Sequence, residues 1–166
     1  MFQKLNISFS ESDFIKLKGE NSFDLPKFKE FSILDTEYLF DILSKQVQFE
    51  VMPHVNITEI IYPGAGPHTD TWQSAINLYL DAGDDETFFW KEITPSKSEK
   101  GLVVYEPMNL EKIGSFKANK GDCYLLDVGN SIHSVKVSNP LVNRKILRLF
   151  WYDLSFDQVL QTIKFL

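Results

Sequence analysis

The stretch Tyr62-Pro63-Gly64-Ala65-Gly66-Pro67-His68-Thr69-Asp70, with the apolar run Ser74–Leu80 that follows it, decides what kind of fold this chain can adopt. The glycines and prolines at 63–67 predict a turn, and the run after Asp70 has the composition of a buried strand. Residues i and i+2 of a strand point to the same face of a sheet, so we expect His68 and Asp70 to share one face at the lip of a strand. The stretch therefore predicts a β-rich fold with two metal-ligand types at a sheet edge.

Short β-type runs separated by turn residues fill the chain from Val55 onward. They are Val55–Ile61, Ser74–Leu80, Thr87–Trp90, Gly101–Tyr105, Cys123–Leu126, Ile132–Val137 and Lys145–Tyr152. Strands at this spacing are typical of a sandwich or jelly roll rather than of alternating βαβ units. We therefore expect a mainly β fold.

Helices are expected only at the flanks of this β region. Asp35–Gln46 has one apolar face and a capping residue at its start, and Ser155 with Gln158 forms a capping box that predicts a last helix. Residues 1–30 have weak periodicity and are expected to form an irregular arm or an edge strand. We interpret the chain as one domain, 1–166, with an N-terminal arm and helix (1–50), a β core (51–153) and a C-terminal helix (154–166).

Length and composition limit the class of protein. The chain has 166 residues, 43% of them hydrophobic and 14% aromatic, which suits one domain with a well-packed core. Its formal net charge is −6 and its pI is near 5.1, so its surface repels phosphate backbones and we expect no nucleic-acid partner. No run approaches the roughly 18 apolar residues of a membrane span, and the first residues do not resemble a signal peptide. Cys123, the only cysteine, is expected to be buried in a reducing, cytoplasmic setting.

Two of the three histidines stand where a metal site needs them. His133 lies in an apolar–polar alternation late in the chain and would supply a third ligand beside His68 and Asp70. Two imidazoles and one carboxylate on one face of an octahedron make the facial triad of non-haem Fe(II) oxygenases, which leaves positions open for a co-substrate and O2. These three residues are therefore candidate ligands of Fe(II).

The candidate ligands belong to a longer pattern. Its pieces, in chain order, are Tyr62-Pro63-Gly64, His68-x-Asp70, Ile76–Leu80, Gly121–Leu126, His133-Ser134-Val135, Arg144 and Phe150-Trp151-Tyr152. Over about residues 55–153 the chain resembles the prolyl 4-hydroxylase-like branch of the Fe(II)- and 2-oxoglutarate-dependent dioxygenases. The resemblance implies a double-stranded β-helix, a cupin-like jelly roll, that holds Fe(II) through His68, Asp70 and His133. It also implies a hydroxylase that uses 2-oxoglutarate and O2, releases succinate and CO2, and acts on a prolyl or other amino-acid residue of a peptide or on a small molecule.

The 2-oxoglutarate site follows from the resemblance together with charge. A carboxylate in an apolar barrel needs a cationic partner, and arginine offers it two parallel hydrogen bonds. Arg144 matches the family position by its distance from His133, and Arg148 shares a strand face with it and is the alternative. Tyr62 and Tyr79 match tyrosines that contact 2-oxoglutarate in this branch. No catalytic residue is expected beyond the metal site.

Other residues near the pattern carry weaker expectations. Asn77 shares a strand face with Tyr79, Trp72 is expected near the mouth of the site, and His54 is expected to be structural or exposed. The polar segment Lys91–Lys100 is either a lid or an ordinary surface connection.

The chain departs from the family pattern in ways that leave alternatives open. The loop between Tyr62 and His68 is short, and Asp84-Asp85 stand where the family has paired glycines. The segment after His133 is long, so the choice between the two arginines stays open. From residues alone, the chain is also compatible with a cupin-type metalloenzyme that does not use 2-oxoglutarate, or with a non-catalytic jelly-roll binding module. The expected partner is a small molecule or short peptide, with no membrane partner, and the sequence indicates no oligomeric state.

Overall fold

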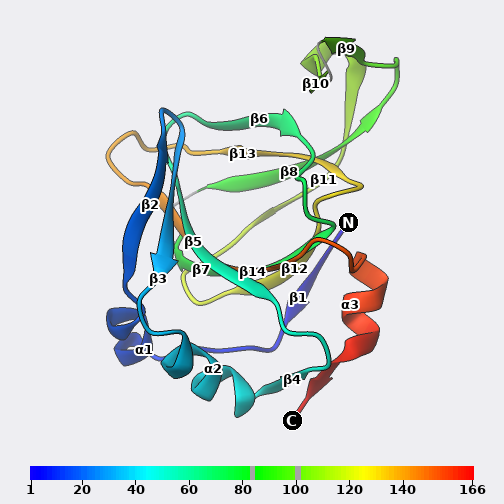
Figure 1. Cartoon of the computed structure of the whole chain (residues 1–166). Helices are drawn as coiled ribbons and strands as arrows, with labels where there is room; N and C mark the ends of the chain where they lie inside the picture. The colour runs from blue at the N-terminus through cyan, green and yellow to red at the C-terminus, as the bar shows by residue number, and fades with distance from the viewer. Residues whose placement is uncertain (83–84, 100–101) are drawn as a thin grey trace.

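Two antiparallel β-sheets face each other in the computed structural model, which describes residues 1–82, 85–99 and 102–166 (Figure 1). The larger sheet has seven strands. Their order is β1 (Phe2–Leu5), β12 (Cys123–Asp127), β7 (Ser74–Asp81), β14 (Arg144–Trp151), β5 (His54–Ile60), β3 (Phe28–Ile33) and β2 (Gly19–Leu25). The smaller sheet has four, in the order β11 (Leu110–Lys117), β8 (Glu86–Glu92), β13 (Ile132–Lys136) and β6 (Gly64–His68).

The remaining elements are short. Two ribbons pair β9 (Lys97–Glu99) with β10 (Leu102–Val104) and β4 (Val47–Phe49) with β15 (Ile163–Phe165), and a 3-10 turn spans Pro107–Asn109. The two facing sheets form a jelly roll of the double-stranded β-helix type, so the predicted fold class is confirmed. No helix in the described part of the chain is long and apolar enough to cross a membrane.

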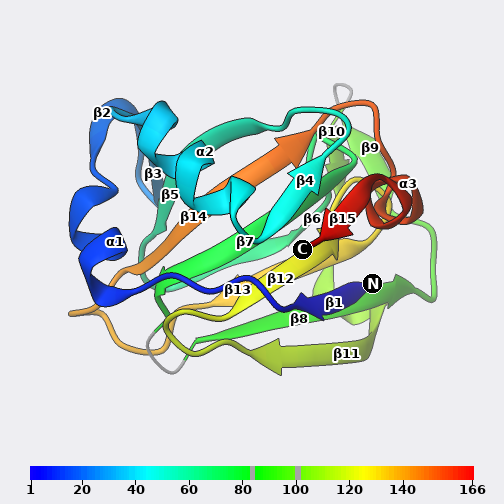
Figure 2. The ribbon, with the colours of Figure 1, turned by 90° about the horizontal axis from the view of Figure 1, so that it is seen from below.

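Three helices cover the outer face of the larger sheet (Figure 2). They are α1 (Glu11–Lys16), α2 (Thr36–Ser44) and α3 (Phe156–Thr162). Both predicted helices are confirmed with their caps: Asp35 accepts a hydrogen bond from the Tyr38 backbone N–H, and Ser155 and Gln158 form the capping box. The first apolar core lies between these helices and the sheet, and it includes Leu39, Leu147 and Cys123. As expected, Cys123 is buried, and its burial raises the pKa of its thiol.

A second core lies between the two sheets, and strand alternation assigns residues to one core or the other. Along β14, Leu147 and Leu149 belong to the helix-side core, whereas Ile146 and Phe150 belong to the inter-sheet core. Arg144 and Arg148 have the same parity as Ile146 and therefore face the space between the sheets. This strand places two cations in the interior of the jelly roll.

Several strands lie where sequence patterns did not predict them. Residues 1–30 form β1, α1 and β2, with β1 and β2 at the two edges of the larger sheet, so only the edge-strand part of that expectation is confirmed. Of the turn expected at 63–67, only its start is confirmed: Tyr62 and Pro63 form a turn, and Gly64–His68 forms β6 at the edge of the smaller sheet, where a proline is tolerated. β11 is mostly exposed and contains a register shift next to Gly114, so it lacks the apolar alternation of a core strand. The expected strand at 101–105 is seen as Leu102–Val104, and Gly101 lies outside the described residues.

Gly64 allows β6 to approach β13, and we expect its replacement to disturb the fold locally. Gly64 has φ of +101°, and a Cβ there would lie 2.1 Å from the carbonyl oxygen of Val135. Gly64→Ala should therefore lower the free energy of unfolding by about 2–4 kcal/mol. Gly66→Ala, on the same strand with no atom near its Cβ position, should change it by less than about 1 kcal/mol. Denaturant unfolding of both variants measures this difference, and equal destabilisation would refute it.

Candidate metal centre

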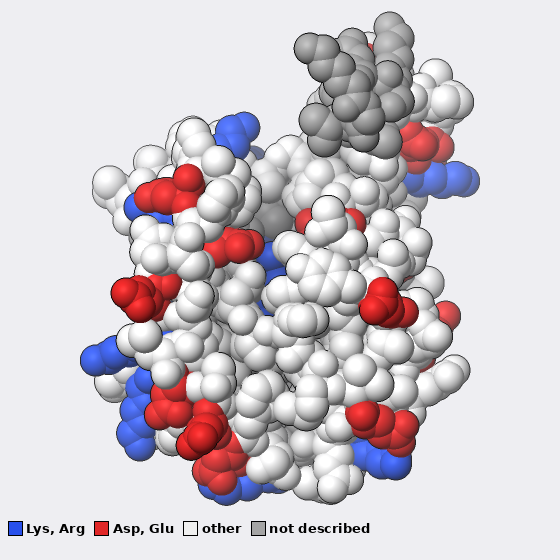
Figure 3. Space-filling view, in the orientation of Figure 1, with Lys and Arg blue, Asp and Glu red and all other residues white. Residues whose placement is uncertain are grey.

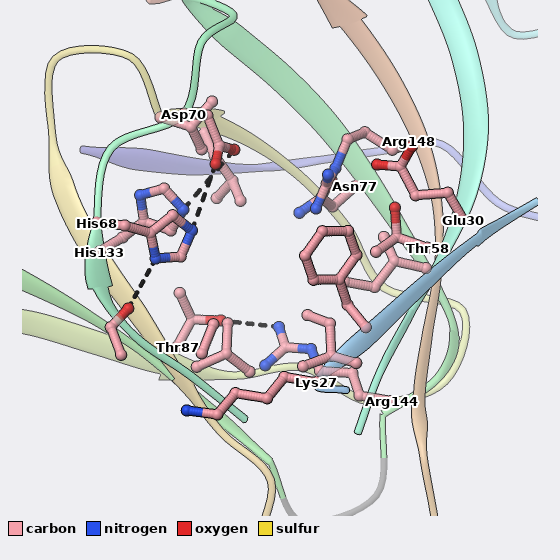
Figure 4. Close-up of a pocket in the computed structure, with 18 of the residues that line it drawn as sticks. Lys27, Glu30, Thr58, His68, Asp70, Asn77, Thr87, His133, Arg144 and Arg148 are labelled. Carbon is pink, nitrogen blue, oxygen red and sulfur yellow. Dashed lines mark hydrogen bonds and ion pairs between the residues drawn. The ribbon is translucent and has the colours of Figure 1, made fainter. Parts of the chain in front are cut away.

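Three ligand-type side chains converge where β6 and β13 meet. His68 is the last residue of β6, and the antiparallel register pairs it directly with His133 on β13, so the imidazole centroids lie 4.3 Å apart. Asp70 follows in the loop beyond β6, where its backbone N–H donates to the Val128 carbonyl at 2.9 Å. The expectation that His68 and Asp70 share a strand is therefore wrong, because β6 ends before Asp70. The loop nevertheless turns the carboxylate toward both histidines (Figure 4).

The distances suit a single ion. Nε2 of His68 is 3.3 Å from Oδ1 of Asp70, and Nε2 of His133 is 3.8 Å from Oδ2. One ligand atom from each residue lies within 4.8 Å of the others. A metal at the centre of such a triangle would have three protein ligands on one side and open positions on the other.

Backbone carbonyls orient both imidazoles. Nδ1 of His68 lies 2.7 Å from the Gly66 carbonyl oxygen, and Nδ1 of His133 lies 3.1 Å from that of Ser131. A carbonyl only accepts hydrogen bonds, so each neutral ring carries its hydrogen on Nδ1 and leaves the lone pair of Nε2 facing Asp70. This is the tautomer that a metal ligand requires.

The electrostatics of the three groups differ. Burial lowers the pKa of His133 to about 4, so this ring is neutral near neutral pH. Burial alone would lower the pKa of His68, but the hydrogen bonds to Asp70 and the Gly66 carbonyl, with the Asp70 charge, raise it above its ordinary value. Burial alone would raise the pKa of Asp70, but the His68 hydrogen bond and the nearby positive charges lower it. The protonated form of His68 and the ionised form of Asp70 therefore stabilise each other.

These shifts predict how metal affinity depends on pH. His133 stays neutral and Asp70 stays ionised near neutral pH, so only the proton on His68 competes with a metal as the pH falls. Below the raised pKa of His68, we expect the affinity for Zn(II) to fall by about tenfold per pH unit, the linkage of one proton. Calorimetric Zn(II) titrations at several pH values measure this slope, with His54→Gln as the control that should leave it unchanged. If the Zn(II) affinity changed with pH as expected for two competing protons, or did not change, the assignment of the single competing proton to His68 would be contradicted.

A cavity of about 610 Å³ opens beside the three ligands, within the size range of small-molecule sites. Figure 3 shows basic atoms inside a recess near the centre of this face. The wall is largely apolar and combines both sheets with the β2–β3 hairpin. Its polar members, apart from the three ligands, are Lys27, Glu30, Thr58, Asn77, Thr87, Arg144 and Arg148.

Arg144 is a buried cation, and no carboxylate of the described residues forms an ion pair with it. It is 1% exposed, and Nη2 donates to Oγ1 of Thr87 at 2.7 Å while the guanidinium lies 4.6 Å from the centroid of the Tyr79 ring. Its Nε and Nη1 are buried and have no hydrogen-bond partner among the described residues. An unpaired buried charge is costly, so this group is poised for an anion that enters the cavity.

Arg148 is half-buried and lines the same cavity from the centre of the sheet. Nε donates to Oδ1 of Asn77 at 3.3 Å, and the guanidinium lies 5.1 Å from the centroid of Trp72. β14 lies between β7 and β5, so an exposed edge position for Arg148 is ruled out. Asn77 and Trp72 also line the cavity, and both had been expected near the site from the sequence.

Neither of the two tyrosines expected to contact 2-oxoglutarate lines the cavity. Tyr62 is 50% exposed and lies in the turn that precedes β6. Tyr79 is fully buried beneath Arg144, and its hydroxyl has no hydrogen-bond partner among the described residues. His54 is exposed and packs on Phe150 at 5.4 Å between centroids, as expected for a structural residue.

Sequence reasoning missed some cavity residues. Thr87, which hydrogen-bonds Arg144, and Thr58 belong to strands that the sequence predicted. The sequence did not indicate which strands pair with them or which residues they contact. Glu30 comes from the segment that carried no clear pattern. Asp85 is buried and accepts from the Ser138 N–H at 2.9 Å, whereas Asp84 lies outside the described residues. Of the segment 91–100, Lys91 and Glu92 end β8 and Lys97–Glu99 form β9, while Lys100 lies outside the described residues.

Comparisons with known proteins support the jelly-roll fold. No protein-family model and no curated protein matches the sequence. A solved oxidoreductase of the 2OG-Fe(II) oxygenase family from Burkholderia pseudomallei is similar over 95% of this chain and 85% of its own, with a TM-score of 0.50 and 11% identity. The ribosomal oxygenase YcfD of Escherichia coli matches with a TM-score of 0.46 and 12% identity, over 87% of this chain and 38% of its own. Vicilin from Capsicum annuum matches with a TM-score of 0.43 and 17% identity, over 82% of this chain and 31% of its own.

At these identities the likeness shows the fold alone. The chain spans about a third of the length of the vicilins that it matches. Fold and site together define a jelly-roll protein with a candidate mononuclear metal centre on the wall of its cavity.

Proposed function

We propose that this protein is an Fe(II)- and 2-oxoglutarate-dependent oxygenase that hydroxylates its substrate and releases succinate and CO2. The observation that carries the proposal is Arg144, a buried cation with two unpartnered nitrogens in the same cavity as His68, Asp70 and His133. A cupin-type metalloenzyme without 2-oxoglutarate has no need for such a cation. A binding module has no need for the converging ligands.

The three ligands fit ferrous iron. Two neutral imidazoles and one carboxylate leave a net positive charge on a bound divalent ion, which favours a dianionic co-substrate. The second coordination shell is in place, because the Gly66 and Ser131 carbonyls orient both histidines.

The other end of the cavity fits the distal carboxylate of 2-oxoglutarate. Arg144 can donate charge-assisted hydrogen bonds from its unpartnered nitrogens, and the Thr87 hydroxyl holds the guanidinium in position. The Tyr79 ring beneath it keeps water away from one face. Apolar residues such as Ile60, Val135 and Ile146 line the space between, and exclusion of water there strengthens the ion pair.

The residues of this chain therefore bind, orient and shield. When bound, Fe(II) with 2-oxoglutarate supplies the oxidising chemistry that places one oxygen atom of O2 into a substrate C–H bond as 2-oxoglutarate becomes succinate and CO2. Arg144 and Thr87 fix one end of the co-substrate, and the two imidazoles and Asp70 fix the metal. The substrate must enter the same cavity, so we propose a small molecule or the end of a short peptide as the partner.

An anaerobic titration of Fe(II) and 2-oxoglutarate into the metal-free protein tests the proposal. We expect a weak visible metal-to-ligand charge-transfer band, which needs chelation of iron by the keto acid. Iron binding without the band would favour the cupin-type metalloenzyme. If neither iron nor 2-oxoglutarate binds, the metal centre itself is refuted.

A further inference from the structure

Arg148 and Glu30 are charged residues of the cavity wall that have no role in the proposed function. Arg148 uses Nε for Asn77 and lies over Trp72, and no ion pair joins it to a carboxylate within the described part of the chain. Glu30 lines the same cavity from the β2–β3 hairpin. Its carboxylate has neither a hydrogen bond nor an ion pair with any described residue. Both side chains are half-buried. Among the described residues, the Arg148 guanidinium and the Glu30 carboxylate thus line one cavity without an ion-pair partner, and Lys27 adds a further exposed cation at its edge.

The sheet register places these charges within reach of one small ligand. Glu30 on β3 pairs with Thr58 on β5, which pairs with Ile146 on β14, two residues before Arg148. Strands are spaced about 4.8 Å apart and rise about 3.4 Å per residue, so the backbones of Glu30 and Arg148 are separated by roughly 12 Å. Both side chains are long and line the same cavity, on the side opposite His68 and His133 in Figure 4. No ion pair joins the two side chains, although both line the same cavity.

We propose that Arg148 binds the carboxylate and Glu30 the ammonium of a free α-amino acid with an apolar side chain, which is the substrate of the oxygenase. This inference rests on the proposed function. An α-amino acid carries the two opposite charges a few ångströms apart, as the wall requires. A simple anion would be repelled by Glu30, and an internal residue of a peptide has neither charge.

The rest of the wall indicates an apolar side chain. Trp72 supports the Arg148 guanidinium, and Phe28 with Leu25 from the hairpin lines the space beside Glu30. Trp72 is two residues beyond Asp70, so a ligand held by Arg148 lies near the metal centre. With Arg144 assigned to 2-oxoglutarate, the two arginines of β14 then separate co-substrate from substrate.

Calorimetry on protein loaded with Zn(II) and 2-oxoglutarate tests this inference, because Zn(II) has no redox chemistry and the complex does not turn over. The probes are the free L-amino acids with apolar side chains, together with the N-acetyl and the carboxamide derivative of each. We expect at least one free amino acid to bind, and both of its derivatives to bind more weakly by about tenfold or more.

Variants separate the two charged contacts. Arg148→Gln should weaken binding of the free amino acid by about a hundredfold, and Glu30→Gln by about tenfold. Glu30→Gln should weaken binding of the N-acetyl derivative much less, because that derivative has no ammonium group. The matched control is Glu59→Gln: Glu59 is on β5 between Thr58 and Ile60 but faces away from the cavity, and it should change nothing.

The same experiment distinguishes failure of this inference from failure of the proposed function. The heat of 2-oxoglutarate binding to the Zn(II)-loaded wild-type protein reports the proposed function, and the heats of the amino acids report this inference. If no free amino acid binds, or if the capped derivatives bind as tightly, the inference is overturned while 2-oxoglutarate binding stands. If Arg148→Gln does not fold, Glu30→Gln and the derivatives on the wild-type protein still decide.

Discussion

Replacement of Asp70 by alanine should reduce Fe(II) affinity by more than about a hundredfold and remove the charge-transfer band. Loss of a residue that only orients a metal ligand costs 10–100-fold, and Asp70 is the one anionic ligand of the three. Its side chain also holds His68 at 3.3 Å, so the variant loses a ligand and the orientation of another. Anaerobic Fe(II) titration and succinate formation in the presence of 2-oxoglutarate measure both effects.

The fold should survive this substitution, which makes the experiment interpretable. The Asp70 loop is held by a backbone hydrogen bond to Val128, which alanine retains. Asp81→Ala is the matched control, because Asp81 is exposed at the end of β7 and does not line the cavity. Near-native iron affinity in Asp70→Ala would refute the facial triad.

Replacement of Arg144 by methionine should weaken 2-oxoglutarate binding by about a hundredfold or more and leave iron binding intact. Truncation of one partner of a buried charge pair costs 2–5 kcal/mol or more. The ligand-free variant should be as stable as the wild type or more stable, since it lacks a buried guanidinium with two unpartnered nitrogens. Thermal unfolding with and without 2-oxoglutarate measures both: only the wild type should gain stability from the ligand.

Lys145→Met is the matched control for Arg144→Met. Lys145 is the next residue on β14, but it faces the other way and lies over Phe31 at 5.6 Å, so it should not affect 2-oxoglutarate. Arg144→Lys should give an intermediate affinity, because lysine keeps the charge and loses the planar fork. If Arg148→Gln abolishes 2-oxoglutarate binding and Arg144→Met does not, the roles of the two arginines must be exchanged.

The prediction of the fold from the sequence succeeded where local pattern and final structure agree. β7 and β14 have long apolar runs bounded by turn residues, and the capping residues of α2 and α3 predict where these helices begin. The predictions failed for β6, whose Gly-Ala-Gly-Pro-His sequence has no strand propensity. That strand exists because β13 supplies the hydrogen bonds and Gly64 tolerates a close approach that other residues would not.

Some residues of the candidate site could be proposed from the sequence, and others could not. His68, Asp70 and His133 were proposed from residue chemistry and order, and Arg144 from the family resemblance and its distance from His133. Thr87 and Glu30 were missed because each has a role only through a partner distant in sequence: Thr87 through Arg144, and Glu30 through the pairing of β3 with β5. Tyr62 matched a pattern but lies outside the cavity.

The sequence by itself determined that this protein is a β-rich domain, that its helices lie at the flanks, and which side chains can bind a metal or an anion. These properties depend on alternation, capping and side-chain chemistry, which neighbouring residues set. Only the tertiary structure decided that His68 faces His133, that Arg144 is left with unpartnered nitrogens, and that the β2–β3 hairpin brings Glu30 to the cavity. Strand register and burial arise from contacts between distant segments, so no local pattern contains them.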